Sequence, residues 1–460
     1  MGATDRMHMV NSFDPHAGVN LGQRASALIE RRQRVLGAPY RLFYERPVEV
    51  SRGEGALLFD PDGADYLDAY NNVPVVGHAN ARVRAAVSDQ LGRVNTHTRY
   101  LTDEIVDYSE RLVSLFPDHL EQVVFACTGS EAVDLALRIA AHVTGGSGIV
   151  ITANAYHGTT QASAAVSPSL GPNNTLPSHV ATVAAPDPLR DPADDGTAAA
   201  LFAQRVEEAI RQLESRGVTF SALIVDSVLS SDGLVTHPTG VLGPAVDVAR
   251  RHGGLYIADE VQPGFGRLGS TWWGFTRHSV APDLVVLGKP MGNGLPISAV
   301  VGRRDLMEAF GRDVRYFNTF GGTPVSIAAA TAVLDEIESR DLRANAASVG
   351  AALREGLHDI SDRDPRLGQA RGEGLFLGVE FVQPADTDEH LPDARLANRV
   401  VNGLREKRVL VSASGRYENV LKIRPPLVFT RAHADRLLTA LDEVLTETSS
   451  SGGETSGHHR

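Results

Sequence analysis

The stretch Val285–Gly294, VVLGKPMGNG, ends an apolar run with a lysine and continues into a glycine-containing loop. Burying an ammonium group at the end of such a run is costly unless the charge is paired or used chemically. Lys289 is therefore the first candidate for a reactive side chain, and the apolar run before it is a candidate buried strand.

Working outward from Lys289, apolar runs alternate with helical patterns from about Ala85 to Ile337. The runs are VVFACT, IVITAN, ALIVDSV, LYIADE and DLVVLGK, and each precedes a polar or glycine-containing turn. Runs of this kind are typical of buried parallel strands. The alternation predicts an α/β fold, with a mainly parallel central sheet covered by helices on both faces.

The flanking regions predict a second, smaller unit. The stretch LLFDPDGADYLDAY predicts a hairpin, whereas the first forty residues show no clear periodicity. Beyond Asp341 the pattern becomes helix, strand GLFLGVEFV, helix and then NVLKIRPPLVFT. We expect an N-terminal segment at residues 1–84 and a large domain at residues 85–337. A small α+β domain at residues 338–446 is expected to include the N-terminal segment, and residues 447–460 are expected to form a disordered Ser/Gly-rich tail.

Composition excludes several classes of function. The formal net charge is -12 and no block of Lys or Arg stands out, so nucleic acid and anionic membranes are not expected partners. No apolar stretch approaches the roughly 18 residues of a membrane span. The opening residues MGATDRMHMVNSFDPH are mixed and polar, so secretion is not expected. The single cysteine, Cys127, excludes an internal disulfide and fits a reducing cytoplasm. No metal site is predicted.

In α/β sheets, ligands bind at the carboxyl ends of the strands. After VVFAC, Thr128 and Glu131 have the spacing of a capping box. The free amides of Gly129 and Ser130 at this helix start would suit a phosphate. Taken alone, a simple helix cap is the commoner meaning of this pattern, and Cys127 beside it is interpreted as a small buried residue.

Two more strand ends carry informative side chains. After IVITAN, Tyr156 and His157 precede a glycine, so the tyrosine ring could lie flat against a planar group, although a core tyrosine is commoner. After LYIA, Asp259 and Glu260 predict at least one partly buried carboxylate. Its partner would be a protonated ring nitrogen or an arginine.

The glycines Gly264, Gly266 and Gly269 match the dinucleotide-binding fingerprint G-x-G-x-x-G. That fingerprint requires a strand directly before it and a helix opening on it. Here Asp259 to Pro263 intervene and STWWGF follows, which disfavours a dehydrogenase. These glycines are expected to let the backbone pass close to a ligand or a partner chain.

A helix start that can bind phosphate, an aromatic ring, a buried acid and a lysine at a strand end together match the groups that bind pyridoxal 5'-phosphate. This cofactor requires a phosphate handle, a stacking surface, a partner for the pyridine nitrogen and an amine for a Schiff base.

The stretches TGSEAVDLALR, AYHGTT, ADEVQPGFGR, LGKPMGNG and FNTFGGTPVS resemble, in order, the motifs of class-III aminotransferases, which are fold type I pyridoxal-phosphate enzymes. The resemblance runs from about Leu42 to Thr446 and implies a homodimer with active sites at the interface. It implies the following roles: Lys289 as Schiff-base lysine, Asp259 at the pyridine nitrogen, Gln262 by the ring hydroxyl, Gly129 and Ser130 at the phosphate, Tyr156 on the ring, His157 and Asp226 as further cofactor-site residues, and Thr319 at the phosphate from the partner subunit. Thr323 replaces the asparagine, and Asp226 the glutamate, that many members carry.

Three features of the resemblance favour elimination of phosphate over transamination. Lys422 stands where amino-acid transaminases of this class usually carry a carboxylate-binding arginine. Ser231, in DSVLSSDG, replaces the glutamate that masks this arginine. Stretches such as EKRVLVSASG are similar to the ethanolamine-phosphate and hydroxylysine-phosphate phospholyases of the class.

The resemblance therefore implies a lyase acting on a small phosphorylated amine, with O-phosphoethanolamine as the first candidate and Lys289 as the base. Lys422 and Arg99, and after them Arg424, are the expected phosphate-binding cations; the alternative for each is a surface salt bridge. The rival enzyme is an ω-amine:2-oxoacid transaminase. A cofactor-binding module without catalysis is a remote alternative, which Lys289 and Asp259 argue against.

Overall fold

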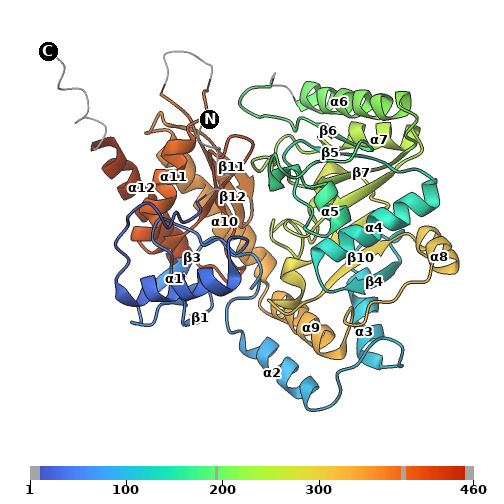
Figure 1. The fold of residues 1–460 in the computed structure, drawn as a ribbon, viewed down its shortest axis with the longest axis horizontal. Coiled ribbons are helices and arrows are strands. Elements are labelled where there is room, and N and C mark those ends of the chain that lie inside the picture. The colour runs from blue at the N-terminus through green and yellow to red at the C-terminus, as the bar shows by residue number, and fades with distance from the viewer. Residues whose placement is uncertain (1–10, 192–194, 385–389, 451–460) are drawn as a thin grey trace.

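The structure is a computed structural model that describes residues 11–191, 195–384 and 390–450. A large unit built on a seven-stranded sheet lies beside a smaller unit in which N- and C-terminal segments come together (Figure 1). The α/β, fold type I architecture predicted from the sequence is confirmed.

The apolar runs form the central sheet. In spatial order it contains β4 (Gln122–Ala126), β10 (Ser298–Gly302), β9 (Leu284–Leu287), β8 (Leu255–Asp259), β7 (Phe220–Asp226), β5 (Gly148–Thr152) and β6 (Val180–Val183). Strands β6, β5, β7, β8 and β9 are parallel, whereas β10 pairs antiparallel with both β9 and β4. All five predicted strands therefore run in one direction. Strands β6 and β10 of this sheet were not predicted. Strand β10 is antiparallel because the connection of residues 288–297 returns the chain beside β9 without a crossover α-helix.

Helices cover both faces of the sheet. The helices of this unit are α2 (Ala81–Leu91), α3 (Asp103–Val113), α4 (Gly129–Thr144), α5 (Gln161–Ala165), α6 (Asp195–Ser215), α7 (Gly243–Arg251), α8 (Arg304–Asp313), α9 (Pro324–Ser339) and the 3-10 turns η1 (Pro168–Leu170), η2 (Gly274–His278) and η3 (Lys289–Gly292). Alternate residues of β9 face opposite sides, so Val286 packs in the cluster with α4 and α8, and Val285 in the cluster with α6 and α7. The strand is buried on both faces, which explains its continuous apolar run.

The smaller unit combines two sheets with four helices. Its elements are β1 (Arg52–Glu54), β2 (Leu57–Phe59), β3 (Asp65–Asp68) and β13 (Val409–Leu410) in one sheet, β11 (Leu367–Glu373), β12 (Phe376–Phe381), β15 (Val420–Ile423) and β14 (Ser412–Ser414) in the other, and α1 (Gln23–Leu36), α10 (Leu342–Ser361), α11 (Ala394–Glu406) and α12 (Arg431–Ser450). The predicted hairpin is β2–β3, whose turn is held by the side chain of Asp60, accepting from the amides of Asp62 and Ala64. Parallel pairing of β13 with β3 joins the two ends of the chain.

At the N-terminal end a helix was not predicted, and at the C-terminal end one expectation was wrong. Helix α1 occupies part of the segment without clear periodicity, although Ala25, Leu28, Ile29, Val35 and Leu36 recur at helical spacing. None of its residues is buried. Helix α12 reaches Ser450, so the first residues of the expected disordered tail are helical. Lys407 Nζ lies 2.9 Å from the carboxylate of Glu443 and 2.7 Å from that of Glu447, which stabilises this last turn. The rest of the tail lies outside the described residues.

Two glycines of the G-x-G-x-x-G match, Gly266 and Gly269, pack against the chain's own helix α10. A Cβ on Gly269 would lie 2.6 Å from the backbone nitrogen of Ala347, and one on Gly266 would lie 2.5 Å from the side chain of Arg343. The close neighbour is therefore α10, not the ligand or partner chain that the sequence led us to expect.

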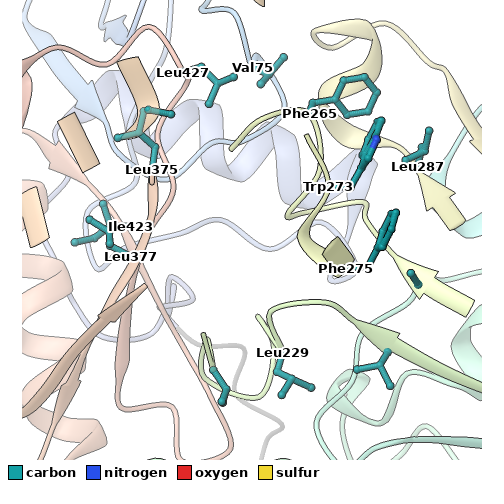
Figure 2. Close-up of a cluster of buried hydrophobic side chains, with 14 of the residues drawn as sticks. Val75, Leu229, Phe265, Trp273, Phe275, Leu287, Leu375, Leu377, Ile423 and Leu427 are labelled. Atoms are coloured by element: carbon teal, nitrogen blue, oxygen red, sulfur yellow. The ribbon is translucent and has the colours of Figure 1, made fainter. Parts of the chain in front are cut away.

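A continuous apolar core and a polar network join the two units. Phe265, Trp273 and Phe275 of the large unit belong to the same buried cluster as Leu377 and Ile423 of the small unit (Figure 2). Both units are thus held by one core, and their contact edge has a fixed geometry.

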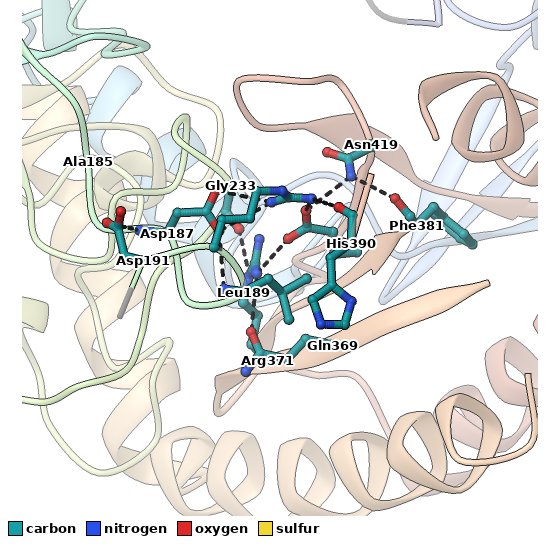
Figure 3. A network of polar contacts seen from close by, with 12 residues as sticks. Ala185, Asp187, Leu189, Asp191, Gly233, Gln369, Arg371, Phe381, His390 and Asn419 are labelled. Carbon is teal, nitrogen blue, oxygen red and sulfur yellow. Dashed lines mark hydrogen bonds and ion pairs between the residues drawn. The ribbon is translucent and has the colours of Figure 1, made fainter. Parts of the chain in front are cut away.

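The polar network lies at the edge of this contact (Figure 3). Arg190 contacts the carboxylates of Asp187 at 3.0 Å and Glu380 at 2.8 Å. Arg371 donates to the carbonyl of Gly233 at 3.0 Å and pairs with Glu380 at 2.8 Å. These bonds tie the loop after β7 to strands β11 and β12.

Candidate active site

Lys289 is the first residue of η3 and is separated from strand β9 by Gly288 alone. Gly288, between them, packs so closely that a Cβ would lie 3.4 Å from the Cα of Gly129. Burial, reinforced by the positive charge of Arg424, lowers the pKa of Lys289 to about 8, although Asp259 and Asp226 oppose this shift. A lysine with this pKa is partly neutral near pH 7, which makes its amine available as a nucleophile or base.

Asp259 is the buried last residue of β8. Its carboxylate accepts the amide of Val261 at 3.0 Å and lies 2.6 Å from Nδ1 of His157. The other ring nitrogen of His157, Nε2, is buried and has no hydrogen-bond partner among the described residues. The arrangement fixes the orientation of Asp259 and presents a buried acid next to Lys289, as the sequence predicted.

The start of α4 lies against this pair. The side chain of Thr128 accepts the amide of Glu131 at 3.2 Å, as the capping spacing predicted, but the carboxylate of Glu131 accepts from the amide of Cys127 at 2.7 Å instead of returning to Thr128. The first amides of a helix have no acceptor within the helix and favour an anion. Gly129 and Ser130 provide these amides.

A glycine is required where the chain crosses Ser130. A Cβ on Gly158 would lie 2.5 Å from the hydroxyl oxygen of Ser130, which accepts the amide of Thr159 at 3.1 Å. The centroid of the Tyr156 ring lies 5.9 Å from Nζ of Lys289. The aromatic side chain and the helix start therefore reach the same space beside the lysine.

Asp226 ends β7 in register with Asp259 on the neighbouring strand. It accepts the amide of Val228 at 2.9 Å and a very short bond from the hydroxyl of Ser230. Burial and the charge of Asp259 raise the pKa of Asp226, while the bonds from Ser230 and Val228 and the charge of Lys422 oppose the increase.

Two cations enter the site from the small unit. Arg424 donates to the side chain of Gln262 and, at 3.0 Å, to the carbonyl of Tyr70, and its guanidinium lies 4.6 Å from the centre of the Tyr70 ring. Lys422 is 6 % exposed, with Nζ 5.7 Å from the centre of the Phe376 ring. Both residues are buried, and neither pairs with a carboxylate among the residues that the structure describes, so the alternative of a surface salt bridge is wrong for both.

The Lys422 ammonium lacks a hydrogen bond or ion pair within the part of the chain that the structure describes. Burial lowers the pKa of Lys422 well below its ordinary value, Arg424 and Lys289 lower it further, and Asp226 and Asp232 oppose the shift. A buried amine without a carboxylate contact has unused capacity to bind an anion, and a bound anion would favour its protonated form.

Arg99 and Thr319 are not brought to this cluster within one chain. Both are exposed, and the Arg99 guanidinium lies 3.8 Å from the centre of the Phe317 ring. The exposed Leu101 and Phe320 lie next to them in sequence. Their predicted roles at the active site remain proposals that require a second subunit.

Sequence reasoning missed other residues of the site. Tyr70 supports Arg424, Ser230 caps Asp226, and Asp232 accepts from the hydroxyl of Thr152 at 2.6 Å and the amide of Asn154 at 3.1 Å. Burial raises the pKa of Asp232 to about 6. No periodicity or spacing marks these positions, because each reaches the site from a loop.

Cys127 is only partly buried, and its Sγ lies 3.7 Å from the side-chain oxygen of Asn318. Burial and the neighbouring Glu131 raise the pKa of the Cys127 thiol to about 11. The thiol is protonated at neutral pH, which agrees with a packing role and not with a nucleophile.

The fold and this donor set define an enzyme that holds pyridoxal phosphate. The orphaned nitrogen of His157, the close approach of Gly158 to Ser130, the free helix start and the Lys289–Asp259 pair all fit the cofactor. Lys289 would bind it, Asp259 would face its ring nitrogen, and Gly129 and Ser130 would hold its phosphate.

Comparison with known proteins identifies the family of the chain. The sequence profile of the family "Aminotransferase class-III" matches residues 43–445. The chain belongs to this family of pyridoxal-phosphate enzymes.

Individual relatives carry two kinds of name. An Arthrobacter phospholyase solved in complex with phosphoethanolamine has 42% sequence identity and a TM-score of 0.88, over 91% of this chain and 99% of that one. An alanine–glyoxylate aminotransferase 2-like protein of Drosophila melanogaster is 39% identical over 91% of this chain and 86% of its own length. Ethanolamine-phosphate phospho-lyase homolog 1 of Caenorhabditis elegans is 34% identical over 91% of this chain and 93% of its own length.

None of the helices in the described part of the chain is long and apolar enough to cross a membrane.

Proposed function

We propose that the protein is a phospholyase that eliminates phosphate from a small phosphorylated amine, with O-phosphoethanolamine as the first substrate to test. The observation that carries this proposal is the buried Lys422, which has no carboxylate contact and lies on the same strand region as Arg424, near Lys289. The name of the Arthrobacter relative supports the same substrate class.

The proposed reaction removes a proton from the amine-bearing carbon and phosphate from the neighbouring carbon. Bound pyridoxal phosphate would supply an electron sink for the negative charge formed when the proton leaves. The neutral Nζ of Lys289 accepts this proton, since its pKa of about 8 lies close to the operating pH. Lys422 and Arg424 bind the leaving phosphate, and uptake of one water gives an aldehyde, ammonia and inorganic phosphate.

The loop after β7 supports elimination over transamination. At Ser231 its backbone carbonyl accepts from the side chain of Asn154, and Arg371 holds the carbonyl of Gly233 at 3.0 Å. No carboxylate occupies position 231 to mask a cation when substrates alternate. A site without a gating carboxylate at position 231 favours one anionic substrate.

The second candidate function is transfer of the amine to a 2-oxoacid. The name of the Drosophila melanogaster relative favours it. In that case Lys422 would bind a substrate carboxylate in place of phosphate.

We further propose a homodimer, because Arg99 and Thr319 lie among exposed apolar side chains. Leu101 is 101% and Phe320 69% exposed in the single chain. A partner subunit covering this face would carry Thr319 to a cofactor phosphate and Arg99 to a substrate phosphate. A cytoplasmic location is supported by the single cysteine.

The test is phosphate release from O-phosphoethanolamine by the cofactor-loaded protein with no 2-oxoacid present. We expect repeated turnover with equal amounts of phosphate and acetaldehyde, and none with Lys289→Ala. No phosphate, but amine transfer once pyruvate is added, would favour the transaminase. Cofactor binding without either reaction would favour a non-catalytic module.

A further inference from the structure

Asp226 is a buried carboxylate in the cationic part of the site that the proposed reaction does not use. It lies at the end of β7, beside Asp259 in the sheet register, and the charges of Lys422 and Lys289 both act on it. Its presence among cations that are proposed to bind an anion requires an explanation, because a negative charge there weakens binding of that anion.

The position of Asp226 is fixed relative to Lys422 by a chain of hydrogen bonds. Ser230 donates to Asp226, and the carbonyl of Ser230 accepts from the hydroxyl of Ser414 at 3.1 Å. Ser414 belongs to β14, the strand that pairs with β15 and places Ser412 opposite Lys422. The loop that orients the carboxylate is therefore attached to the strands that carry the cation.

The charged and titratable groups that act on Asp226 come from four sides. Asp259, Glu260 and Tyr256 lie on β8 or directly after it, Asp232 lies on the loop, and Lys289 and Lys422 lie on the opposite elements. Two of these groups are cations. Lys289 is proposed to be bonded to the cofactor, which leaves Lys422 as the cation that balances Asp226.

We propose that Asp226 is a positioning residue that acts through Lys422 and sets how much negative charge the substrate's anionic group must carry. Ionised Asp226 balances Lys422 before substrate binds. A doubly charged group is favoured when Asp226 is neutral, because Lys422 and Arg424 are then both uncompensated. A singly charged group gains less binding affinity when Asp226 becomes neutral. This inference rests on the proposed function for its statement that the anionic group is a phosphate.

Two ligands of matched shape test the proposal. Taurine and 2-aminoethylphosphonate share a two-carbon amine and a tetrahedral anionic group. At about pH 8 the anionic group of taurine carries one negative charge and that of 2-aminoethylphosphonate carries two. Neither has a phosphate ester to expel, so binding is measured apart from turnover. The dissociation constants are obtained by calorimetry on cofactor-loaded wild type, Asp226→Asn, Asp226→Ser, Asp226→Glu and Lys422→Met.

We expect Asp226→Asn and Asp226→Ser to increase the preference for the phosphonate over taurine by at least about tenfold, as expected for removing one nearby buried charge. Asp226→Glu restores the charge and should return the preference toward the wild-type value, while Lys422→Met lowers it. Thermal unfolding identifies any variant that is not folded. If one of the two neutral variants, Asp226→Asn or Asp226→Ser, does not fold, the other still provides the test.

A loss of affinity by the same factor for both ligands would overturn the proposal, because a merely structural role does not distinguish their charges. An unchanged preference in the neutral variants would do the same. Failure of the proposed function is separate: the protein could discriminate the two ligands and still release no phosphate from O-phosphoethanolamine.

Discussion

At the scale of single residues, Lys289 combines a nucleophilic amine with a surrounding that keeps it partly neutral. Burial lowers its pKa to about 8, so the neutral fraction rises with pH and approaches completion above that value. We expect the rate at which the cofactor-free protein captures pyridoxal phosphate to rise through about pH 8 and then level off. Absorbance of the bound cofactor measures this rate, and the same reaction with Nα-acetyl-lysine corrects for titration of the cofactor. A corrected rate that does not change with pH would contradict this pKa.

Lys422 carries the substrate proposal, and its replacement gives the sharpest test of one side chain. We expect Lys422→Met to raise KM for O-phosphoethanolamine at least about tenfold, since a hydrogen bond to a charged group is worth roughly 1.5–3 kcal/mol. Lys407→Met is the matched control, because Lys407 makes only surface ion pairs with Glu443 and Glu447. Equal kinetics in the two variants would remove Lys422 from the phosphate site.

The site could be predicted only in part from individual residues. Lys289, Asp259, Gln262 and Lys422 belong to recognisable motifs, and the structure brings them together. Tyr70 could not be predicted, because its carbonyl meets Arg424 only after the N-terminal segment folds against β15. Contacts between segments more than 350 positions apart leave no local pattern in the sequence.

At the scale of elements, Glu260 holds the end of β8 to the start of η2. Its carboxylate accepts from the hydroxyl of Ser227 at 2.5 Å and from the amides of Gly274 and Phe275 at 2.7 Å each. A glutamine has one acceptor oxygen and would turn its amide group toward at least one of these donors. We expect Glu260→Gln to lower the thermal midpoint by an amount equivalent to about 1–3 kcal/mol.

The matched control for this element is Glu308→Gln on α8, where the carboxylate lies 3.9 Å from Arg304 and is 48% exposed. We expect this exposed change to leave the midpoint nearly unaltered. If both variants unfold at the wild-type temperature, the proposed anchoring by Glu260 is wrong.

Element prediction succeeded for strands that are fully buried and alternate with helices, and it failed for elements such as α1 and β10. Strand β9 is buried on both faces and forms a continuous apolar run. Helix α1 buries no residue, and the apolar stripe of Ala25, Leu28, Ile29 and Leu36 in its sequence was not recognised. Strand β10 is equally buried, but the antiparallel return breaks the alternation of strand and helix that directed the prediction.

At the scale of the whole molecule, the proposed dimer would complete the site from outside. We expect sedimentation equilibrium to give about twice the chain mass of 49.2 kDa. Leu101→Asp combined with Phe320→Asp should shift the protein toward monomer and reduce activity, because an exposed apolar face is replaced by charge. Val35→Asp on α1, where Val35 is 73% exposed, serves as a control for added charge elsewhere. A wild-type monomer with full activity would contradict the dimer.

We propose that the enzyme converts its substrate to aldehyde, ammonia and phosphate and does not transfer the amine to a 2-oxoacid. The most direct measurement gives the cofactor-loaded protein O-phosphoethanolamine and pyruvate together and quantifies phosphate, acetaldehyde and alanine. We expect phosphate and acetaldehyde in equal amounts, with no alanine. Alanine formed while the phosphate stays on the carbon chain would contradict it and identify the protein as a transaminase.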